Sequence, residues 1–77
     1  MPNGIKNWNY TDVRTVLREH GFKLNAWTGS HHFYIASHSG KRWQVAVPFH
    51  GPKIFKPRTM KGIITQSGLK KQEWGIK

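Results

Sequence analysis

The side chains of this sequence that are suited to proton transfer near neutral pH are five histidines: His20, His31, His32, His38 and His50. Cysteine is absent, which excludes thiol nucleophiles, thiolate metal sites and disulfides. The three acidic residues are too few and too scattered for the carboxylate cluster that a two-metal nuclease requires. The sequence therefore favours histidine acid–base chemistry without a metal or another cofactor.

The charge of the chain indicates what such chemistry would act on. Thirteen Lys and Arg residues against three acidic residues give a formal net charge of +10, of which +8 lies in residues 41–77. A one-sided excess of this kind suits a polyanion, because every phosphate that is neutralised releases counterions. A solubilising surface is the alternative. The best candidates for phosphate contacts are Lys41, Arg42, Lys53, Lys56, Arg58 and Lys61.

Histidines and cations together match the needs of RNA cleavage without a metal. That reaction needs a base for the 2′-hydroxyl proton, an acid for the leaving oxygen and cations near the phosphate. An unperturbed histidine, with a pKa of about 6.5, suits the first two tasks, and Lys and Arg suit the third.

The five histidines differ in their expected roles. His31 and His32 are neighbours on a predicted strand, so they point to opposite faces and make a poor zinc pair. His50 follows a strand end and is either a second functional histidine or a loop residue without a role. His20 shares the apolar stripe of a helix, which predicts packing or capping, and His38 lies in a turn and is expected to be solvated.

Hydrophobic periodicity predicts the elements that carry these residues. An apolar stripe from Val13 to His20, with Asn9 or Thr11 as N-cap and Gly21 as the stop, predicts a helix over about residues 11–20. Residues 21–50 read as three short strands with turns at 28–30 and 37–40, and Phe22, Leu24 and Ala26 alternate with polar residues. A second helix starts at Pro57 and stops at Gly68.

The order helix-strand-strand-strand-helix predicts an α+β fold in which both helices cover one face of a three-stranded antiparallel sheet. We expect a single domain over residues 1–77, with a lead (1–9) and a tail (70–77) that are candidates for fraying. The sequence has no apolar run long enough for a signal peptide or a membrane helix, which predicts a cytoplasmic protein without a membrane partner.

Two sequence signals conflict over the side of the sheet on which His31 lies. His31 shares its parity with Phe33 and Ile35, which favours a buried histidine. We nevertheless expect an exposed His31, because the preceding Gly29-Ser30 turn can re-aim it. Phe33 and Ile35 would then form an apolar patch that requires a partner.

Several short motifs, in order, resemble the HicA (YcfA-like) mRNA interferases. They lie between about Tyr10 and Leu69: Leu17-Arg18-Glu19-His20-Gly21-Phe22, Gly29-Ser30-His31-His32-Phe33-Tyr34, Val45-Ala46-Val47-Pro48-Phe49-His50, Lys56-Pro57-Arg58-Thr59 and Ser67-Gly68-Leu69. The departures are a longer lead, the aromatic Trp43 and a Ser-His-Ser sequence in the second turn.

The resemblance implies a double-stranded-RNA-binding-domain-like fold and a ribonuclease toxin that cleaves single-stranded mRNA. It implies that His31, directly after Gly29 and Ser30, is the catalytic residue. Beside the resemblance, His32 and His50 are our second candidates. It also implies an acidic HicB-like antitoxin as partner. Two alternatives stay open: a double-stranded RNA-binding module without catalysis, and an inactive relative with an interaction role.

Overall fold

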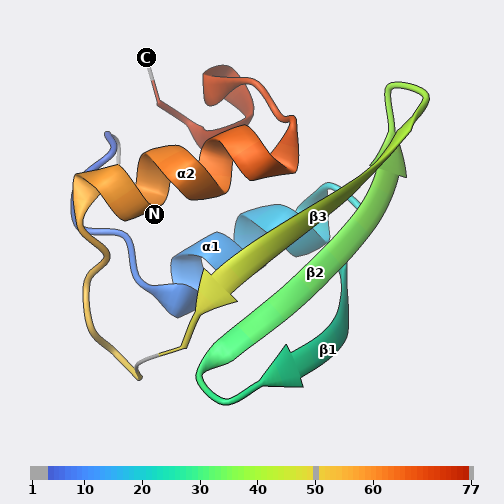
Figure 1. Cartoon of the computed structure of the whole chain (residues 1–77). Coiled ribbons are helices and arrows are strands. Elements are labelled where there is room, and N and C mark those ends of the chain that lie inside the picture. The colour runs from blue at the N-terminus through green and yellow to red at the C-terminus, as the bar shows by residue number, and fades with distance from the viewer. Residues whose placement is uncertain (1–3, 50, 77) are drawn as a thin grey trace.

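The computed structural model describes residues 4–49 and 51–76, and its element order confirms the predicted α+β fold (Figure 1). The elements are α1 (Tyr10–Glu19), β1 (Lys23–Thr28), β2 (His31–His38), β3 (Lys41–Pro48), α2 (Pro57–Ser67) and a 3-10 helix η1 (Lys71–Trp74). Both helices and the sheet contribute to one hydrophobic core, and one face of the sheet is left open, as in double-stranded-RNA-binding domains.

The three strands form an antiparallel sheet in the order β1-β2-β3, so β2 is central. Two two-residue turns connect them. Gly29 opens the first turn with φ 56°, and in the second both Ser39 (φ 52°) and Gly40 (φ 74°) are left-handed. Such turns match the twist of antiparallel strands and therefore fix the register. As a result His31, the first residue of β2, is paired with Thr28 on one side and with Pro48 on the other.

Strand β1 differs from the expected simple alternation. Leu24 pairs with Tyr34 and Ala26 with Phe33, which leaves Asn25 as an extra residue in the strand. This irregularity reverses the parity beyond it, as a β-bulge does. Leu24 therefore lies on the helix side of the sheet and Ala26 on the other side, whereas the sequence pattern placed them together.

Local signals set both helices. Asn9 is the N-cap of α1: its side chain accepts from the Asp12 N–H, and the Asp12 side chain accepts from the Asn9 N–H. This capping box satisfies two backbone donors that a helix start leaves free. Pro57 opens α2 as predicted, and Gly68 ends it with φ 68°. A Cβ on Gly68 would lie 2.6 Å from the Trp43 ring, so glycine is required there by both conformation and space.

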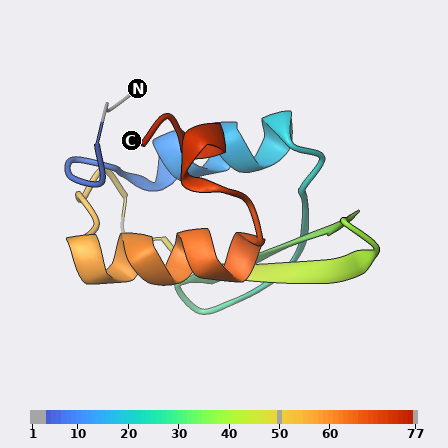
Figure 2. The ribbon, with the colours of Figure 1, turned by 90° about the horizontal axis from the view of Figure 1, so that it is seen from above.

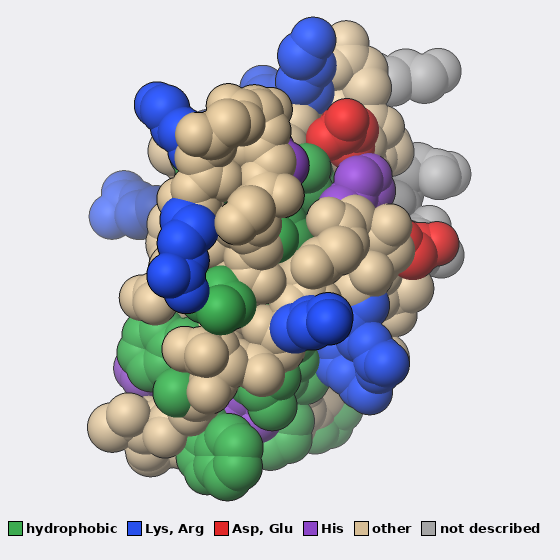
Figure 3. Space-filling model, turned by 90° about the vertical axis from the view of Figure 1, so that its right-hand side faces the viewer, with side chains coloured by type: hydrophobic (Ala, Val, Ile, Leu, Met, Phe, Trp, Pro, Cys, Tyr) green, Lys and Arg blue, Asp and Glu red, His purple; other side chains and the backbone are tan. Residues whose placement is uncertain are grey.

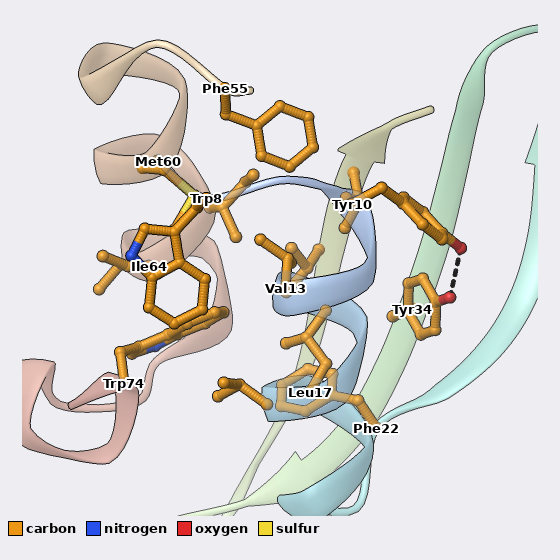
Figure 4. Close-up of a cluster of buried hydrophobic side chains, with 14 of the residues drawn as sticks. Trp8, Tyr10, Val13, Leu17, Phe22, Tyr34, Phe55, Met60, Ile64 and Trp74 are labelled. Atoms are coloured by element: carbon orange, nitrogen blue, oxygen red, sulfur yellow. Dashed lines mark hydrogen bonds between the residues drawn. The ribbon is translucent and has the colours of Figure 1, made fainter. Parts of the chain in front are cut away.

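The core lies between the sheet and the two helices, which run in about the same direction (Figures 1 and 2). Val13 and Leu17 enter it from α1, and Met60 and Ile64 from α2 (Figure 4). The sheet contributes alternate residues: Tyr34, Val45 and Val47. These are odd-numbered positions of β3 and an even-numbered position of β2, and they define the helix side of the sheet.

The described parts of the lead (residues 4–9) and of the tail (residues 70–76) are packed against this core, whereas the sequence pattern made both segments candidates for fraying. Trp8 is fully buried, and its indole N–H donates to the Gly4 carbonyl 2.5 Å away. Trp74, on η1, is 2% exposed and meets Trp8 edge-on with ring centroids 5.6 Å apart (Figure 4). The physical reason is buried area: each indole removes a large apolar surface from water, and this stabilises the two segments although neither has a hydrophobic period.

Candidate functional site

His31 lies at the start of β2, directly after the Gly29-Ser30 turn, and its side chain is exposed, as expected. Pairing with Thr28 and Pro48 fixes its backbone from both sides. The N–H of Phe49 also donates to the Ser30 carbonyl, 2.5 Å away, and so continues the ladder past His31. The structure thus holds an accessible imidazole on a well-anchored backbone, which a proton-transferring group requires.

His31 belongs to the face of the sheet that no helix covers, here called the open face. The odd-numbered residues of β2 lie on it, and Phe33 and Ile35 are half-buried there. Ala26 and Ala46 flank Phe33 on the neighbouring strands. An apolar strip therefore extends from His31 along the central strand.

His32 points to the helix side of the sheet and does not join His31. Its Nδ1 is 2.8 Å from the Tyr10 hydroxyl, and its ring stacks on Phe49 with a centroid distance of 4.9 Å and an angle of 11°. Trp27, its cross-strand partner, lies at 6.4 Å and is 67% exposed. His32 therefore anchors the start of β2, which favours a positioning role over direct chemistry.

The contact that holds His32 continues to a buried tyrosine. The Tyr10 hydroxyl is 2.5 Å from the Tyr34 hydroxyl (Figure 4). Because the same hydroxyl contacts His32 Nδ1, the side chains of His32, Tyr10 and Tyr34 form one chain of hydrogen bonds. Burial raises the pKa of Tyr10 well above its usual range, the bond to Tyr34 adds to the rise, and the Arg14 guanidinium opposes it. Tyr10 therefore stays a neutral hydroxyl near pH 7.

The other histidines have separate surroundings. His20 caps α1, with Nδ1 2.9 Å from the Val16 carbonyl, in keeping with the predicted capping role. The prediction of a solvated His38 is wrong: β2 continues to His38, its Nε2 lies 2.8 Å from the Ser67 carbonyl, and its ring stacks on Trp43. The turn is shorter than predicted, so His38 reaches α2 rather than water. His50 lies outside the described residues.

The six basic side chains expected to bind phosphate are exposed but do not gather at one place. Lys41 is paired with His38, at the end of β2 opposite His31, about 23 Å away at 3.3 Å per residue. Arg42 follows it on β3. Lys53 and Lys56 line a hollow of about 310 Å³ that includes Pro48, the strand neighbour of His31. Lys61 instead borders a separate hollow beside Ile5 and Ile76.

A larger cationic feature escaped the sequence analysis. A hollow of about 500 Å³ lies between α1 and β1, here called the α1–β1 hollow. Its polar and aromatic lining comes from Tyr10, Arg14, Arg18, Phe22, Lys23, His32 and Tyr34. The signal was available, since Tyr10, Arg14 and Arg18 follow at intervals of four and must share a helix face. The apolar stripe of Val13, Val16 and Leu17 lies on a neighbouring face of α1 and gives no indication of these cations.

The acidic side chains of the described residues are not clustered. Asp12 is engaged in the α1 capping box, and residues 4–49 and 51–76 contain no group of three or more His, Cys, Asp or Glu side chains that could hold a metal ion. Within the same residues, no helix has the length and apolar character needed to cross a membrane.

Comparison with known proteins adds one finding. A family model described as HicA toxin of bacterial toxin–antitoxin matches residues 10–69 of the 77-residue chain. The match begins at the first residue of α1 and ends just after Gly68, so it covers the sheet, both helices and His31. None of the curated proteins matches the chain.

Proposed function

This chain belongs to the HicA toxin family, and on that premise we propose that it is an endoribonuclease toxin that cleaves single-stranded mRNA without a metal ion, with His31 as its general base. The observation that carries the proposal is the exposed imidazole of His31 on the open face, at a turn that fixes its backbone. A net charge of +10 supplies the attraction to RNA.

The proposed reaction is a transesterification. The His31 imidazole takes the proton of a ribose 2′-hydroxyl, and the 2′-oxygen attacks the adjacent phosphorus. The bond from phosphorus to the 5′-oxygen breaks, so the products carry a 2′,3′-cyclic phosphate and a 5′-hydroxyl. The leaving oxygen takes its proton from an acid, for which His50 is the sequence candidate, or from water. Lys53 and Lys56 line a hollow with Pro48, which supports them as our candidates for stabilising the charge on the phosphate.

The test is cleavage of an unstructured RNA by the purified chain in the presence of excess EDTA. We expect cleavage to continue at an undiminished rate, because proton transfer by histidine needs no metal. A duplex of the same sequence serves as the matched control and should be cleaved much more slowly. Cleavage that stops in EDTA and returns with Mg²⁺ would contradict the mechanism. Binding of duplex RNA without any cleavage would instead favour the non-catalytic RNA-binding module.

We also propose that an acidic HicB-like antitoxin covers the open face and excludes RNA. The apolar strip of Phe33 and Ile35 beside His31 fits the centre of a protein interface. Acidic residues around that centre would complement the charge of the chain and speed the encounter. Binding on this face would bury His31 and so stop catalysis by occlusion.

We expect an acidic protein to be encoded beside this chain, and co-expression of the two tests the partner. We expect the pair to copurify and the complex to lose RNA cleavage. A Phe33→Arg variant should weaken the complex by at least about 30-fold, the effect of losing a central interface residue, whereas Lys70→Gln should have no effect. A complex that forms and still cleaves RNA at the rate of the free chain would rule out occlusion.

A further inference from the structure

The α1–β1 hollow exists because the helix side of β1 has no helix over it. The core lies over β2 and β3, and the apolar residues of β1 on this side stay accessible: Leu24 is 45% exposed and Trp27 is 67% exposed. Helix α1 forms the opposite wall with Tyr10, Arg14 and Arg18. The result is a hollow with an aromatic and aliphatic floor.

The charges around the α1–β1 hollow have one sign. Arg14 and Arg18 stand one helical turn apart on α1, and Lys23 faces them from the start of β1. None of the described residues that line the hollow is acidic. Three cations at the rim of one concave surface focus a positive potential there, which favours an anionic ligand.

The end of the hollow nearest the β1–β2 turn is aromatic. His32 lines the hollow, Trp27 lies 6.4 Å from it across the strand pair, and Phe49 stacks on its other side. Figure 3 shows hydrophobic side chains gathered in the lower part of this surface, with histidine among them and Lys and Arg side chains above. Exposed aromatic rings beside cations are the arrangement by which proteins hold unpaired bases and their phosphates.

The hollow and His31 lie on opposite sides of the sheet but meet at the same edge. Trp27 precedes the turn by two residues, and His31 follows the turn directly. Lys23 lies five residues before Thr28, about 17 Å further along β1 at 3.3 Å per residue. A flexible strand can therefore run from Lys23 and Arg14 past Trp27 and over the turn to His31, whereas a rigid duplex could not bend around this edge.

We propose that the α1–β1 hollow binds the single-stranded RNA that continues from the nucleotide at His31, with Arg14, Arg18 and Lys23 on phosphates and Trp27 under a base. This extends the proposed ribonuclease function, on which the identity of the ligand rests. An acidic segment of the antitoxin is the alternative occupant, because the three cations would attract it as well. RNA is favoured because the aromatic rings lie at the end of the hollow closest to His31.

The test measures binding of a fluorescein-labelled, unstructured RNA by anisotropy, in a His31→Ala background so that the RNA stays intact. The Arg14→Gln/Lys23→Gln variant removes two exposed cations of the hollow, and Lys70→Gln/Lys71→Gln removes two exposed cations elsewhere. The salt slope is that of the logarithm of the binding constant against the logarithm of the salt concentration. Each single-strand phosphate contact contributes about 0.7 to its magnitude, so the slope of the hollow variant should be smaller by about 1.4. The ratio by which the hollow variant binds RNA more weakly than the parent chain should then become about sevenfold smaller between 50 and 200 mM salt.

The control variant should keep a slope closer to that of the parent chain, because its lysines touch the RNA only through the general field. Trp27→Ala should weaken binding by about tenfold at any salt, since stacking does not depend on counterions. Equal slopes for the hollow and control variants would overturn the proposal. So would a hollow variant that binds RNA normally but no longer copurifies with the antitoxin, because the occupant would then be the protein partner.

These outcomes separate this proposal from the catalytic one. A parent chain that does not cleave RNA, combined with a hollow variant that loses the salt-dependent binding, would reject catalysis and retain the RNA site. With cleavage intact, restoring His31 in the hollow variant should raise KM and leave kcat unchanged, because the site binds substrate and transition state alike. An unchanged KM would contradict a substrate site.

Discussion

A His31→Ala variant is expected to cleave RNA about 10²- to 10⁴-fold more slowly than the parent chain, the usual cost of losing a general base. The fold should survive, because the His31 side chain is exposed and its structural role is carried by backbone pairing with Thr28 and Pro48. Single-turnover cleavage of a labelled RNA and a circular dichroism melt measure the two effects separately.

The neighbouring histidine supplies the control. His32→Ala removes the partner of the Tyr10 hydroxyl and the ring that stacks on Phe49, so it should lower the melting temperature. Its cleavage rate below the melting transition should fall less than that of His31→Ala, since its ring lies on the other side of the sheet. A folded His31→Ala variant with undiminished cleavage, or a larger loss in His32→Ala, would remove His31 from the mechanism.

The helices could be predicted from the sequence because their determinants are local. Val13, Val16 and Leu17 define one face of α1, and Pro57 and Gly68 mark both ends of α2. The sequence allows either Asn9 or Thr11 as the N-cap of α1, and the capping box with Asp12 identifies Asn9 as the N-cap. Such signals lie within a few residues of the feature that they set.

The irregularity of β1 could not be predicted in this way. The residues from Phe22 to Ala26 alternate regularly in polarity, and the extra residue at Asn25 appears only in the register against β2. Its consequence is that Leu24 lies on the helix side of the sheet, where it lines the α1–β1 hollow.

The side of His31 was ambiguous for a related reason. Strand β2 is central and carries apolar residues on both sides, Phe33 and Ile35 outward and Tyr34 and Ala36 inward. Alternation of polarity cannot distinguish two apolar faces, so only the Gly29-Ser30 turn argued for exposure. Net charge likewise gave the class of ligand but not its place, because Lys41 and Lys56 are far apart in the fold although both lie in the basic half.

For the tail, the sequence pattern and the structure lead to different expectations, and a stability measurement can distinguish them. Residues 70–77 have no hydrophobic period, which suggested fraying, yet Trp74 is 2% exposed and packs edge-on against the buried Trp8. The order of this segment therefore depends on a partner at the opposite end of the sequence, which no local signal reports.

A Trp74→Ala variant is expected to lower the free energy of unfolding by about 3–5 kcal/mol, the usual cost of truncating a buried tryptophan. A 77-residue domain has roughly 4–12 kcal/mol in total, so the variant should unfold at a much lower urea concentration or be partly unfolded in buffer. Urea titration followed by far-ultraviolet circular dichroism gives the midpoint and the slope for variant and parent.

The matched control is Trp74→Phe. The indole N–H of Trp74 is buried and has no hydrogen-bond partner within the described part of the chain, so its contribution comes from the apolar ring. Phenylalanine keeps most of that contact and removes the unpaired donor, and its loss should stay below about 1.5 kcal/mol. If the tail were frayed, both variants would lie within about 0.5 kcal/mol of the parent chain, as exposed substitutions do. A large loss for alanine with a small one for phenylalanine would place the tail in the core, where it supports α1 and, through Tyr10, the strand that holds His31.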